Sequence, residues 1–573
     1  MRILGIHDGH TSTACFFEDG RILDAVSEER FTRVKGQGGF PREAVEWILA
    51  SRGLEPGDID RIALVGEVRP LVSIEQYAVG RQRVFPYVVK LYPGDPRGLI
   101  RAYVAHNRKK RLATPELTAG LTASGLSADK IEVVGHHLSH AATAYYLSPF
   151  HLDRKPTLVV TLDGSGDGLC GTVSSVDEEG NWRRLRDLST FDSLGMVFSR
   201  ATQYLAMKPW EHEYKLMGMA PYVSAKYARA AREILGRYVR LTDDGLGLRN
   251  PSRLWGNSVL ARMRKDFIGH RFDAVAAGAQ MLHEQLVVEL IGNWLRETGL
   301  RRLAVAGGCF MNVKANKLLM EMGECEELFV MPSGGDESCA IGSALWAYRQ
   351  ARQDGDGPIQ PVGGLYWGPG FTGEQIEQAL KPFADKVEFR RCDDVEAESA
   401  GLLAEHKIIG RLRGRMEWGA RALGARSIVA NPSRPQNLRR LNAAIKMRDF
   451  WMPFAPSILY ERRADYAILP TDYVSYHMTM AYDSTAKARE DLVAALHPYD
   501  YTMRPQFVTR ELNADYHKLL SEFEKLTGIG GVLNTSFNLH GWPIVCSPED
   551  ALRTLLNSEL DYVSLEDYLV WRK

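Results

Sequence analysis

The chain has 573 residues, of which 45% are hydrophobic and 25% are charged, and a single core rarely extends beyond about 300 residues, so we expect two or three domains. Its 71 basic and 71 acidic residues cancel, which leaves no overall field to attract nucleic acid or an anionic membrane. We also expect no signal peptide and no membrane span, and the seven cysteines form no CxxC pair, so a cytoplasmic location is expected.

The chain opens with three short apolar runs at residues 2–6, 13–17 and 21–26, separated by a polar loop and an Asp19-Gly20 turn. This pattern predicts a strand, a loop and a hairpin. Asp8 and His10 follow the first run on alternate residues, a spacing that can direct both side chains into one cleft. A carboxylate beside an imidazole is typical of a general-base pair.

A Gly-rich stretch follows the sequence SEERFTRV and carries Lys35. A flexible cation at this place could meet an anionic substrate, and a solvated surface loop is the alternative. Downstream, the sequence GHHLSHAATAYY predicts a helix on which His136 and His140 are four residues apart. Both imidazoles then lie on one helix face and can share a metal ion, although core histidines would show the same spacing.

The same order of strand, loop and hairpin recurs from residue 157. It consists of the run TLVVTL, the loop DGSGDG, the run LCGTVSSV, a DEEGN turn and WRRL. We interpret this as an internal duplication. Two such halves are the arrangement of the actin-like ATPase (ribonuclease H-like) and sugar-kinase folds, which hold a nucleotide or acyl phosphate between them. Two unrelated hairpins are the alternative interpretation.

Two aspartates add to the histidine pair. Asp163 ends the predicted strand at residues 157–162, and Asp336 lies in the Gly-flanked loop of SGGDESCAIGSAL. Two imidazoles and two carboxylates suit Fe(II) first, with Mn(II) or Zn(II) as alternatives. In AVAGGCFMNVKAN, Gly307 and Gly308 would let backbone amides approach a phosphate or carbamoyl oxygen, and Asn312 is a further candidate for substrate binding, while a tight turn is the alternative.

The stretch RQDGDGPIQPVGG at residues 352–364 predicts a linker between a first domain at 1–355 and a second α/β domain at 365–573. Cations gather in the second domain, among them Arg421, Lys446, Arg448 and Arg504, and LNTSFNLHGWPIV adds Asn534 and Asn538. So many cations in apolar settings suggest phosphate ligands, although ion pairing within the domain is the alternative.

Taken together, these motifs resemble the NodU/CmcH-type O-carbamoyltransferase family of nodulation-factor and antibiotic biosynthesis. The matching segments follow the family order from residue 1 to about residue 570: MRILGI with His10, SEERFTR, HHLSH, LDGSGDG, EYKLMGMAPY, GGCFMNVKAN, GGDESCAIGSA, ARALGARSI, IKMRDFWMPFAPS and LNTSFNLHGWPIV. The resemblance implies a duplicated first domain similar to the tRNA threonylcarbamoyl transferases and a second domain similar to YrdC.

The resemblance also implies a two-step reaction. The second domain would form carbamoyl-adenylate from carbamoyl phosphate and ATP, the latter with Mg²⁺, and the first domain would pass the carbamoyl group to a hydroxyl of a small-molecule acceptor. Carried over to this sequence, the metal ligands are His136, His140, Asp163 and Asp336, the catalytic histidine is His10 with Asp8 near it, and the substrate lysine is Lys35. The adenylate contacts are Arg421, Lys446, Arg504, Asn534 and Asn538, and Arg448 is a further candidate for binding ATP or the adenylate.

The sequence departs from the family pattern at Met452, where an Arg commonly precedes Pro-Phe. Arg448 or Arg415 would then have to supply the missing phosphate contact. A threonylcarbamoyl-type tRNA-modifying enzyme is the alternative function, and net charge zero weighs against it. A non-catalytic actin-like nucleotide-binding module is a third interpretation. We expect no nucleic-acid or membrane partner, and a homodimer remains open.

Overall fold

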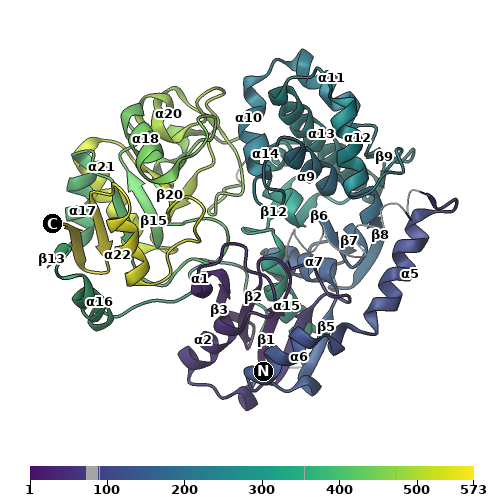
Figure 1. The fold of residues 1–573 in the computed structure, drawn as a ribbon, viewed down its shortest axis with the longest axis horizontal. Coiled ribbons are helices and arrows are strands. Elements are labelled where there is room, and N and C mark those ends of the chain that lie inside the picture. The colour runs from purple at the N-terminus through teal and green to yellow at the C-terminus, as the bar shows by residue number, and fades with distance from the viewer. Residues whose placement is uncertain (73–87, 89–90, 354, 472) are drawn as a thin grey trace. The chain divides into compact units, whose positions relative to one another are not determined.

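The computed structural model describes residues 1–72, 88, 91–353, 355–471 and 473–573. It divides the chain into two compact units (Figure 1). Unit 1 contains residues 1–28 and 36–362, and unit 2 contains residues 29–35 and 363–573. A short stretch of the N-terminal sequence therefore packs with the C-terminal half of the chain.

Unit 1 contains two five-stranded sheets with the same topology. The first has the order β3-β2-β1-β4-β5 and the second β8-β7-β6-β11-β12, when read from its antiparallel edge. In each sheet the first three strands form an antiparallel meander, and the last two run parallel to the first strand. The predicted internal duplication and actin-like α/β fold are confirmed by this repeated order.

The strands of the two sheets are short and largely buried. The first sheet contains β1 (Arg2–His7), β2 (Thr13–Glu18), β3 (Arg21–Ser27), β4 (Arg61–Val65) and β5 (Ile131–Val134). The second contains β6 (Thr157–Gly166), β7 (Leu169–Val176), β8 (Trp182–Ser189), β11 (Arg302–Ala306) and β12 (Glu327–Val330), and a separate ribbon pairs β9 (Arg240–Leu241) with β10 (Leu248–Arg249).

Helices connect the strands of unit 1. They are α2 (Arg42–Arg52), α5 (Pro96–Arg108), α6 (Pro115–Ala123), α7 (His136–Tyr146), α8 (Phe150–Asp153), α9 (Leu194–Tyr204), α10 (Glu213–Met219), α11 (Ala225–Leu235), α12 (Asn257–Asp266), α13 (Phe272–Thr298), α14 (Val313–Glu321) and α15 (Cys339–Ala351). Helix α13 carries apolar residues at helical spacing, and most of them are buried.

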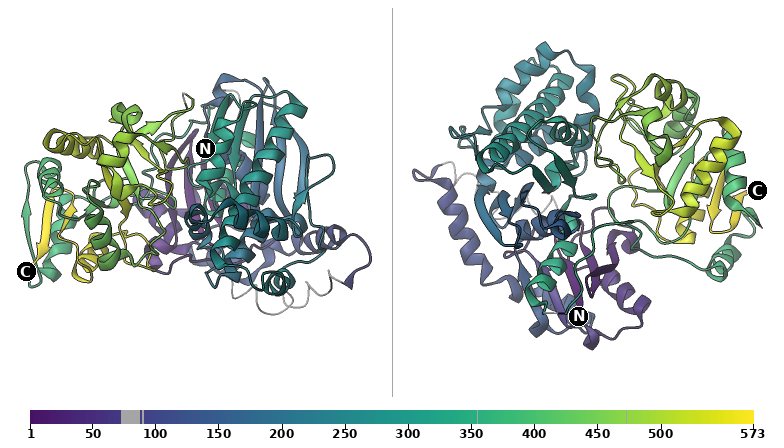
Figure 2. Two further views of the ribbon diagram at one scale, coloured as in Figure 1. Left: turned by 90° about the horizontal axis from the view of Figure 1, so that it is seen from above. Right: turned by 180° about the vertical axis from the view of Figure 1, so that it is seen from behind.

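Unit 2 is built on one mixed eight-stranded sheet with the order β13-β22-β21-β14-β15-β20-β16-β19. Two further views show this green-to-yellow part of the chain as one continuous group of strands and helices (Figure 2). Its strands are β13 (Val387–Arg391), β14 (Ile409–Leu412), β15 (Arg426–Ala430), β16 (Ala455–Leu459), β19 (Gln506–Val508), β20 (Gly531–Ser536), β21 (Tyr562–Leu565) and β22 (Tyr568–Arg572), with a small ribbon of β17 (Ala467–Ile468) and β18 (Asp483–Ser484).

The helices of unit 2 include one contributed from the N-terminal sequence. They are α1 (Glu29–Thr32), α16 (Gly373–Leu380), α17 (Val395–Ala404), α18 (Pro435–Leu441), α19 (Arg463–Tyr466), α20 (Ala486–Asp491), α21 (Ala514–Thr527) and α22 (Pro548–Leu556). The expected mixed α/β character of this half is confirmed. None of the helices in the described ranges is long and apolar enough to cross a membrane.

Candidate metal and anion sites

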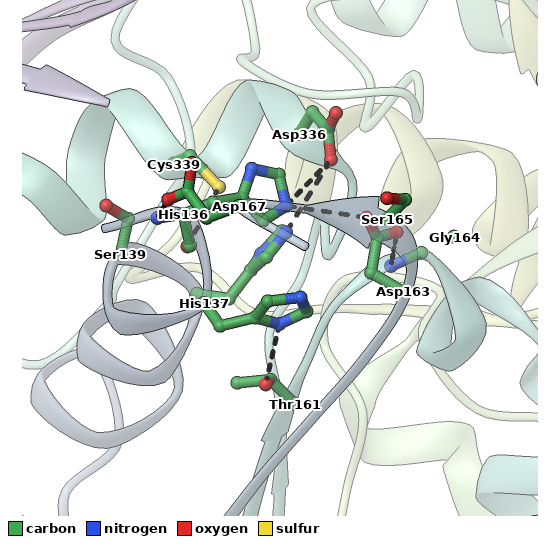
Figure 3. A network of polar contacts seen from close by, with 12 residues as sticks. His136, His137, Ser139, Thr161, Asp163, Gly164, Ser165, Asp167, Asp336 and Cys339 are labelled. Carbon is green, nitrogen blue, oxygen red and sulfur yellow. Dashed lines mark hydrogen bonds and ion pairs between the residues drawn. The ribbon is translucent and has the colours of Figure 1, made fainter. Parts of the chain in front are cut away.

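Four donor side chains lie close together in unit 1, on segments at the carboxyl ends of strands from both five-stranded sheets. His136 and His140 come from consecutive turns of α7, Asp163 from the end of β6, and Asp336 from the turn that precedes α15. The imidazole Nε2 of His136 lies 3.4 Å from a carboxylate oxygen of Asp163 and 3.6 Å from one of Asp336, which is also 3.6 Å from His140 Nε2. Figure 3 shows His136 directed toward both carboxylates. The four predicted ligands are therefore brought together.

The spacing of these atoms fits a shared cation. All four donor atoms lie within 4.8 Å of one another. Ligands bound at about 2.0–2.2 Å from one ion are about 3.0–3.5 Å apart, which is close to the distances found here. Among the described residues, His136 Nε2 and His140 Nε2 are buried without a hydrogen-bond partner, as expected of nitrogens that bind a metal.

The charges of the cluster support the same interpretation. Burial lowers the pKa of His136, but Asp336 and Asp163 outweigh burial and raise its pKa to about 9. Burial likewise raises the pKa of Asp163, yet the close imidazole of His136 and the other nearby histidines bring it below its usual range. The carboxylates thus require positive charge beside them, which either a proton or a metal ion supplies.

Cys339 is a fifth nearby donor that the sequence analysis missed. Its sulfur lies close enough to His136 and His140 to share an ion with them. Burial, with further contributions from Asp336 and Asp163, raises the pKa of the thiol well above its ordinary value. A neutral thiol is a poor metal ligand, so the two imidazoles and two carboxylates form the stronger donor set.

His10 lies on the loop between β1 and β2, beside the aromatic ring of Trp210 at a centroid distance of 5.5 Å. Its backbone amide donates to the carbonyl of Leu71 at 2.9 Å. Asp8, its predicted partner, is buried and accepts two hydrogen bonds from Arg111, at 2.9 and 2.6 Å. The side chains of Asp8 and His10 thus stand in different surroundings, despite their alternate spacing in sequence.

The predicted substrate-binding loop after β11 contacts Asp163, one of the four candidate metal ligands. The amide of Gly308 donates to Asp163 Oδ1 at 3.0 Å. Gly307 has a φ of 108°, and a Cβ there would lie 2.2 Å from the carbonyl oxygen of Leu162, so only glycine fits. Asn312 caps α14 through the amide of Ala315 and forms a paired amide contact with Gln280. The Gly308 contact positions Asp163, and substrate binding by the three residues stays a prediction.

Cations gather in unit 2 around the strand β20. The Nε atom of Arg504 is buried without a hydrogen-bond partner among the described residues. Burial, followed by the charges of Arg421 and Arg448, lowers the pKa of Arg504. Burial also lowers the pKa of Lys446, with Arg448 and Lys35 as the next causes. The neighbouring residues that lower the pKa values of Arg504 and Lys446 are themselves cations. A cluster of positive charges of this kind is typical of an anion site.

Lys446 ends a π-helical turn at Asn442–Lys446, a rare feature that often occurs at functional positions. Its ammonium lies 2.9 Å from the carbonyl oxygen and 2.8 Å from the amide oxygen of Asn538. Asn534 donates to Ala422 and to Ser457, which ties the loop bearing Arg421 to the sheet. The two asparagines therefore organise the cluster, whereas their contact with a ligand stays a prediction.

Two further residues bear on the missing arginine at position 452. Met452 is buried, and Arg415 is occupied by backbone carbonyls of Gly368 and Trp367. Arg448 lies within the cluster, where one of its guanidinium nitrogens donates to Thr535 Oγ1 at 3.0 Å. Of the two proposed substitutes, Arg448 is the one placed beside the other cations.

Residues 2–345 match the family described as "Carbamoyltransferase N-terminus", and residues 400–572 match "Carbamoyltransferase C-terminus". The chain belongs to the carbamoyltransferase family. It is 31% identical to the nodulation protein NolNO of Sinorhizobium fredii over 99% of this chain and 79% of that protein. It is 27% identical to nodulation protein U of Rhizobium tropici, over 94% of this chain and 91% of that protein.

Two solved structures that match part of this carbamoyltransferase are less similar to it in sequence. Full-length HypF in a phosphate- and nucleotide-bound form is 13% identical, with a TM-score of 0.32, covering 62% of this chain and 56% of that chain. Component A of the Acidaminococcus fermentans (R)-2-hydroxyglutaryl-CoA dehydratase is 15% identical, with a TM-score of 0.33, covering 62% of this chain and 100% of that one. The fold assignment therefore rests on the repeated strand order of unit 1.

Sequence patterns did not reveal three other residues that hold the carbamoyltransferase sites in place. Arg111 lies in the basic stretch HNRKKR, where composition indicates a solvated helix face, yet it is buried. Asp167 accepts the amide of His136 at 2.7 Å, and Glu417 accepts the amides of Leu423, Ala425 and Arg426. Only their position in a Gly-rich loop or an apolar setting could have suggested such roles.

Proposed function

We propose that this carbamoyltransferase uses ATP and carbamoyl phosphate to form carbamoyl-adenylate in unit 2 and transfers the carbamoyl group to a hydroxyl of a small-molecule acceptor in unit 1. The observation that carries the proposal is the cation cluster of unit 2. Burial and neighbouring cations lower the pKa values of Lys446 and Arg504. A bound polyphosphate would offset the repulsion between these positive charges.

The first step replaces the phosphoryl group of carbamoyl phosphate with the adenylyl group of ATP. Water would take the phosphoryl group of carbamoyl phosphate, and the carbamate oxygen set free would attack the α-phosphorus of ATP. The bond between the α- and β-phosphates would break and release pyrophosphate. Arg421, Arg448 and Arg504 would neutralise the charge that accumulates on the phosphate oxygens, with ATP entering as its Mg²⁺ complex.

The second step forms the carbamate ester. The acceptor hydroxyl would attack the carbamoyl carbon, its proton would pass to the imidazole of His10, and AMP would leave with the electrons of the broken C–O bond. A metal held by His136, His140, Asp163 and Asp336 would supply Lewis-acid polarisation of an oxygen ligand. Fe(II), Mn(II) and Zn(II) all accept this mixed nitrogen and oxygen donor set.

The decisive measurement is pyrophosphate release by the full-length protein. With ATP and carbamoyl phosphate present, pyrophosphate and AMP should form, and omission of carbamoyl phosphate should stop both. A protein that releases no pyrophosphate under these conditions would contradict the proposal. The nucleotide-binding alternative predicts ATP binding without this dependence on carbamoyl phosphate.

The division of labour is tested by replacing one metal ligand. His140→Ala should remove the bound metal and stop carbamoyl transfer, while pyrophosphate release in unit 2 continues. The control is His106→Ala, which removes an exposed histidine of α5 that contacts Lys110. If His140→Ala leaves the metal content of the purified protein unchanged, the ligand assignment is wrong.

A further inference from the structure

The segment that follows β4, residues Gly66–Leu71, contacts both parts of the transfer site in unit 1. At one end, Arg111 donates to the carbonyls of Val65 and Gly66, each at 2.9 Å. In its middle, the amide of Val68 donates to Asp167 Oδ1 at 3.0 Å. At its other end, the carbonyl of Leu71 accepts the amide of His10. We call this stretch the β4 exit segment.

Arg111 ties the β4 exit segment to the loop that carries His10. Its guanidinium binds both oxygens of Asp8 and two carbonyls at the end of β4, so its donors bridge the ends of two neighbouring parallel strands. Arg111 and Asp8 are 2% and 6% exposed, so the pair is desolvated, and loss of one partner would leave an uncompensated buried charge. A planar guanidinium fixes orientation as well as distance.

Asp167 ties the same segment to the metal ligands. One carboxylate oxygen accepts the amide of Val68, and the other accepts the amide of His136 at the first residue of α7. Figure 3 shows Asp167 beside His136. A Cβ at the neighbouring Gly166 would lie 2.1 Å from the His136 ring, so this turn is built to hold that imidazole closely.

The contacts also change the role expected for Asp8. A partner that activates His10 would need a carboxylate oxygen directed at the imidazole, but both oxygens of Asp8 accept from Arg111. The carboxylate therefore acts on the backbone path between β1 and His10 rather than on the proton of the imidazole.

We propose that Arg111 and Asp167 are positioning residues, which use the β4 exit segment to fix His10 relative to the metal ligands of α7. The proposal rests on the proposed function, because it assumes that transfer takes place at His10 beside the metal. The proposal also makes Asp8 a positioning residue, which acts through its contact with Arg111.

The Asp167 contact is tested with a metal alone. Mn²⁺ is titrated into the metal-free full-length protein and followed by electron paramagnetic resonance. Asp167→Ala should weaken Mn²⁺ binding by about 10–100-fold, the usual effect of losing a residue that orients a ligand. Asp167→Asn keeps one acceptor oxygen and should fall between Asp167→Ala and the wild type. Equal Mn²⁺ affinity in Asp167→Ala and the wild type would overturn this assignment.

The Arg111 contact is tested by discharge of carbamoyl-adenylate formed in the full-length protein from ATP and carbamoyl phosphate. AMP release is followed in single turnover between pH 5.5 and 9, with water alone and with glycerol as hydroxyl acceptor. Arg111→Gln and Asp8→Asn should each slow discharge by about 10–100-fold without moving the pH midpoint, because a misplaced group loses rate but keeps its own pKa. The double variant should be no slower than either single variant.

Other outcomes are equally informative. If the pH midpoint of discharge shifts in Asp8→Asn but not in Arg111→Gln, Asp8 is a partner of the His10 imidazole. That result would overturn the proposed positioning role. Effects that multiply in the double variant, or rates equal to those of the wild type, would also overturn it. The control is Lys109→Gln, an exposed change in the same basic stretch, which should discharge at the wild-type rate. A wild type that releases no pyrophosphate contradicts the proposed function and not this inference.

Discussion

At the residue scale, Lys446 shows how burial and neighbouring charge prepare a site for an anion. The side chain is 3% exposed, and burial, followed by the charges of Arg448 and Lys35, lowers the pKa of its ammonium group. A bound phosphate would raise that pKa again by placing negative charge beside the ammonium. The free energy that the site spends on repulsion is thus recovered when the ligand binds.

This leads to a pH-dependent prediction. Because the folded-state pKa of Lys446 lies below its unfolded value, the stability that the group contributes is present above about pH 10.4 and is lost as the pH falls through the folded pKa. Pyrophosphate binding should therefore be coupled to proton uptake, and its affinity should fall as the pH rises through the folded pKa. Calorimetric titration in two buffers with different ionisation enthalpies measures the protons directly.

The control for this titration is Lys446→Met, which keeps an unbranched side chain but cannot take up a proton. It should bind pyrophosphate more weakly and without the buffer-dependent heat. Binding heats of the wild type that do not depend on the buffer would contradict the prediction.

At the element scale, helix α15 is held against its neighbours by glycines. A Cβ at Gly342 of α15 would lie 1.9 Å from the carbonyl oxygen of Ser139 on α7, and one at Gly5 of β1 would lie 2.0 Å from the carbonyl oxygen of Ala340. These close backbone approaches set the distance between α7, which carries His136 and His140, and the turn that carries Asp336. The geometry of the candidate metal ligands therefore depends on how closely two helices pack.

We predict that Gly342→Ala separates α7 from α15. Overpacking of this kind usually costs about 1–3 kcal/mol of the free energy of unfolding, and it should also weaken Mn²⁺ binding because His140 and Asp336 move apart. Thermal unfolding and Mn²⁺ titration measure the two effects. Gly98→Ala is the control, since its position in α5 has open space around the added methyl group. A Gly342→Ala protein with wild-type stability would contradict the packing argument.

At the scale of the whole molecule, the chain is not divided simply into an N-terminal and a C-terminal half. Residues 29–35 pack with unit 2, where Arg33 donates to the carbonyls of Ile544 and Pro543 at 2.7 and 3.0 Å and pairs with Asp550 at 3.3 Å. Phe31 packs against a small apolar cluster that includes Met416 and Cys546. Unit 2 therefore includes a segment that a fragment of residues 365–573 would lack.

We predict that Arg33→Gln destabilises unit 2 in the full-length protein. Charge-assisted hydrogen bonds contribute about 1.5–3 kcal/mol each to stability, so the unfolding temperature should fall. Pyrophosphate affinity should fall as well, because the change loosens the segment that carries Lys35, one of the charges acting on Lys446. Lys35→Ala should weaken pyrophosphate binding with little change in unfolding temperature.

The matched control for Arg33 is Arg42→Gln, which removes an exposed arginine that pairs with Glu46 on α2. If Arg33→Gln unfolds at the wild-type temperature and binds pyrophosphate normally, the segment is not an integral part of unit 2. Activity of an isolated fragment of residues 365–573 would point to the same conclusion.

Local patterns were sufficient for much of the fold and for the four candidate metal ligands. Short apolar runs and turn residues predicted the repeated order of strands at residues 2–26 and 157–185. This was possible because strand periodicity and turn formation depend on neighbouring residues. The helical spacing of His136 and His140, together with two aspartates in Gly-flanked loops, predicted four donors that the structure brings within 4.8 Å. The ordered motifs predicted the family, which the comparisons confirmed.

Only the tertiary structure decided which partners each polar group meets. Asp8 and His10 are two residues apart, yet Asp8 binds Arg111, which is 103 residues away in sequence. Asp167, 31 residues from His136, holds its amide, and residues 29–35 join the unit formed by the other end of the chain. Spacing determines which side chains share a face of one element, whereas pairing across elements depends on how buried charges find partners once the sheets and helices have packed.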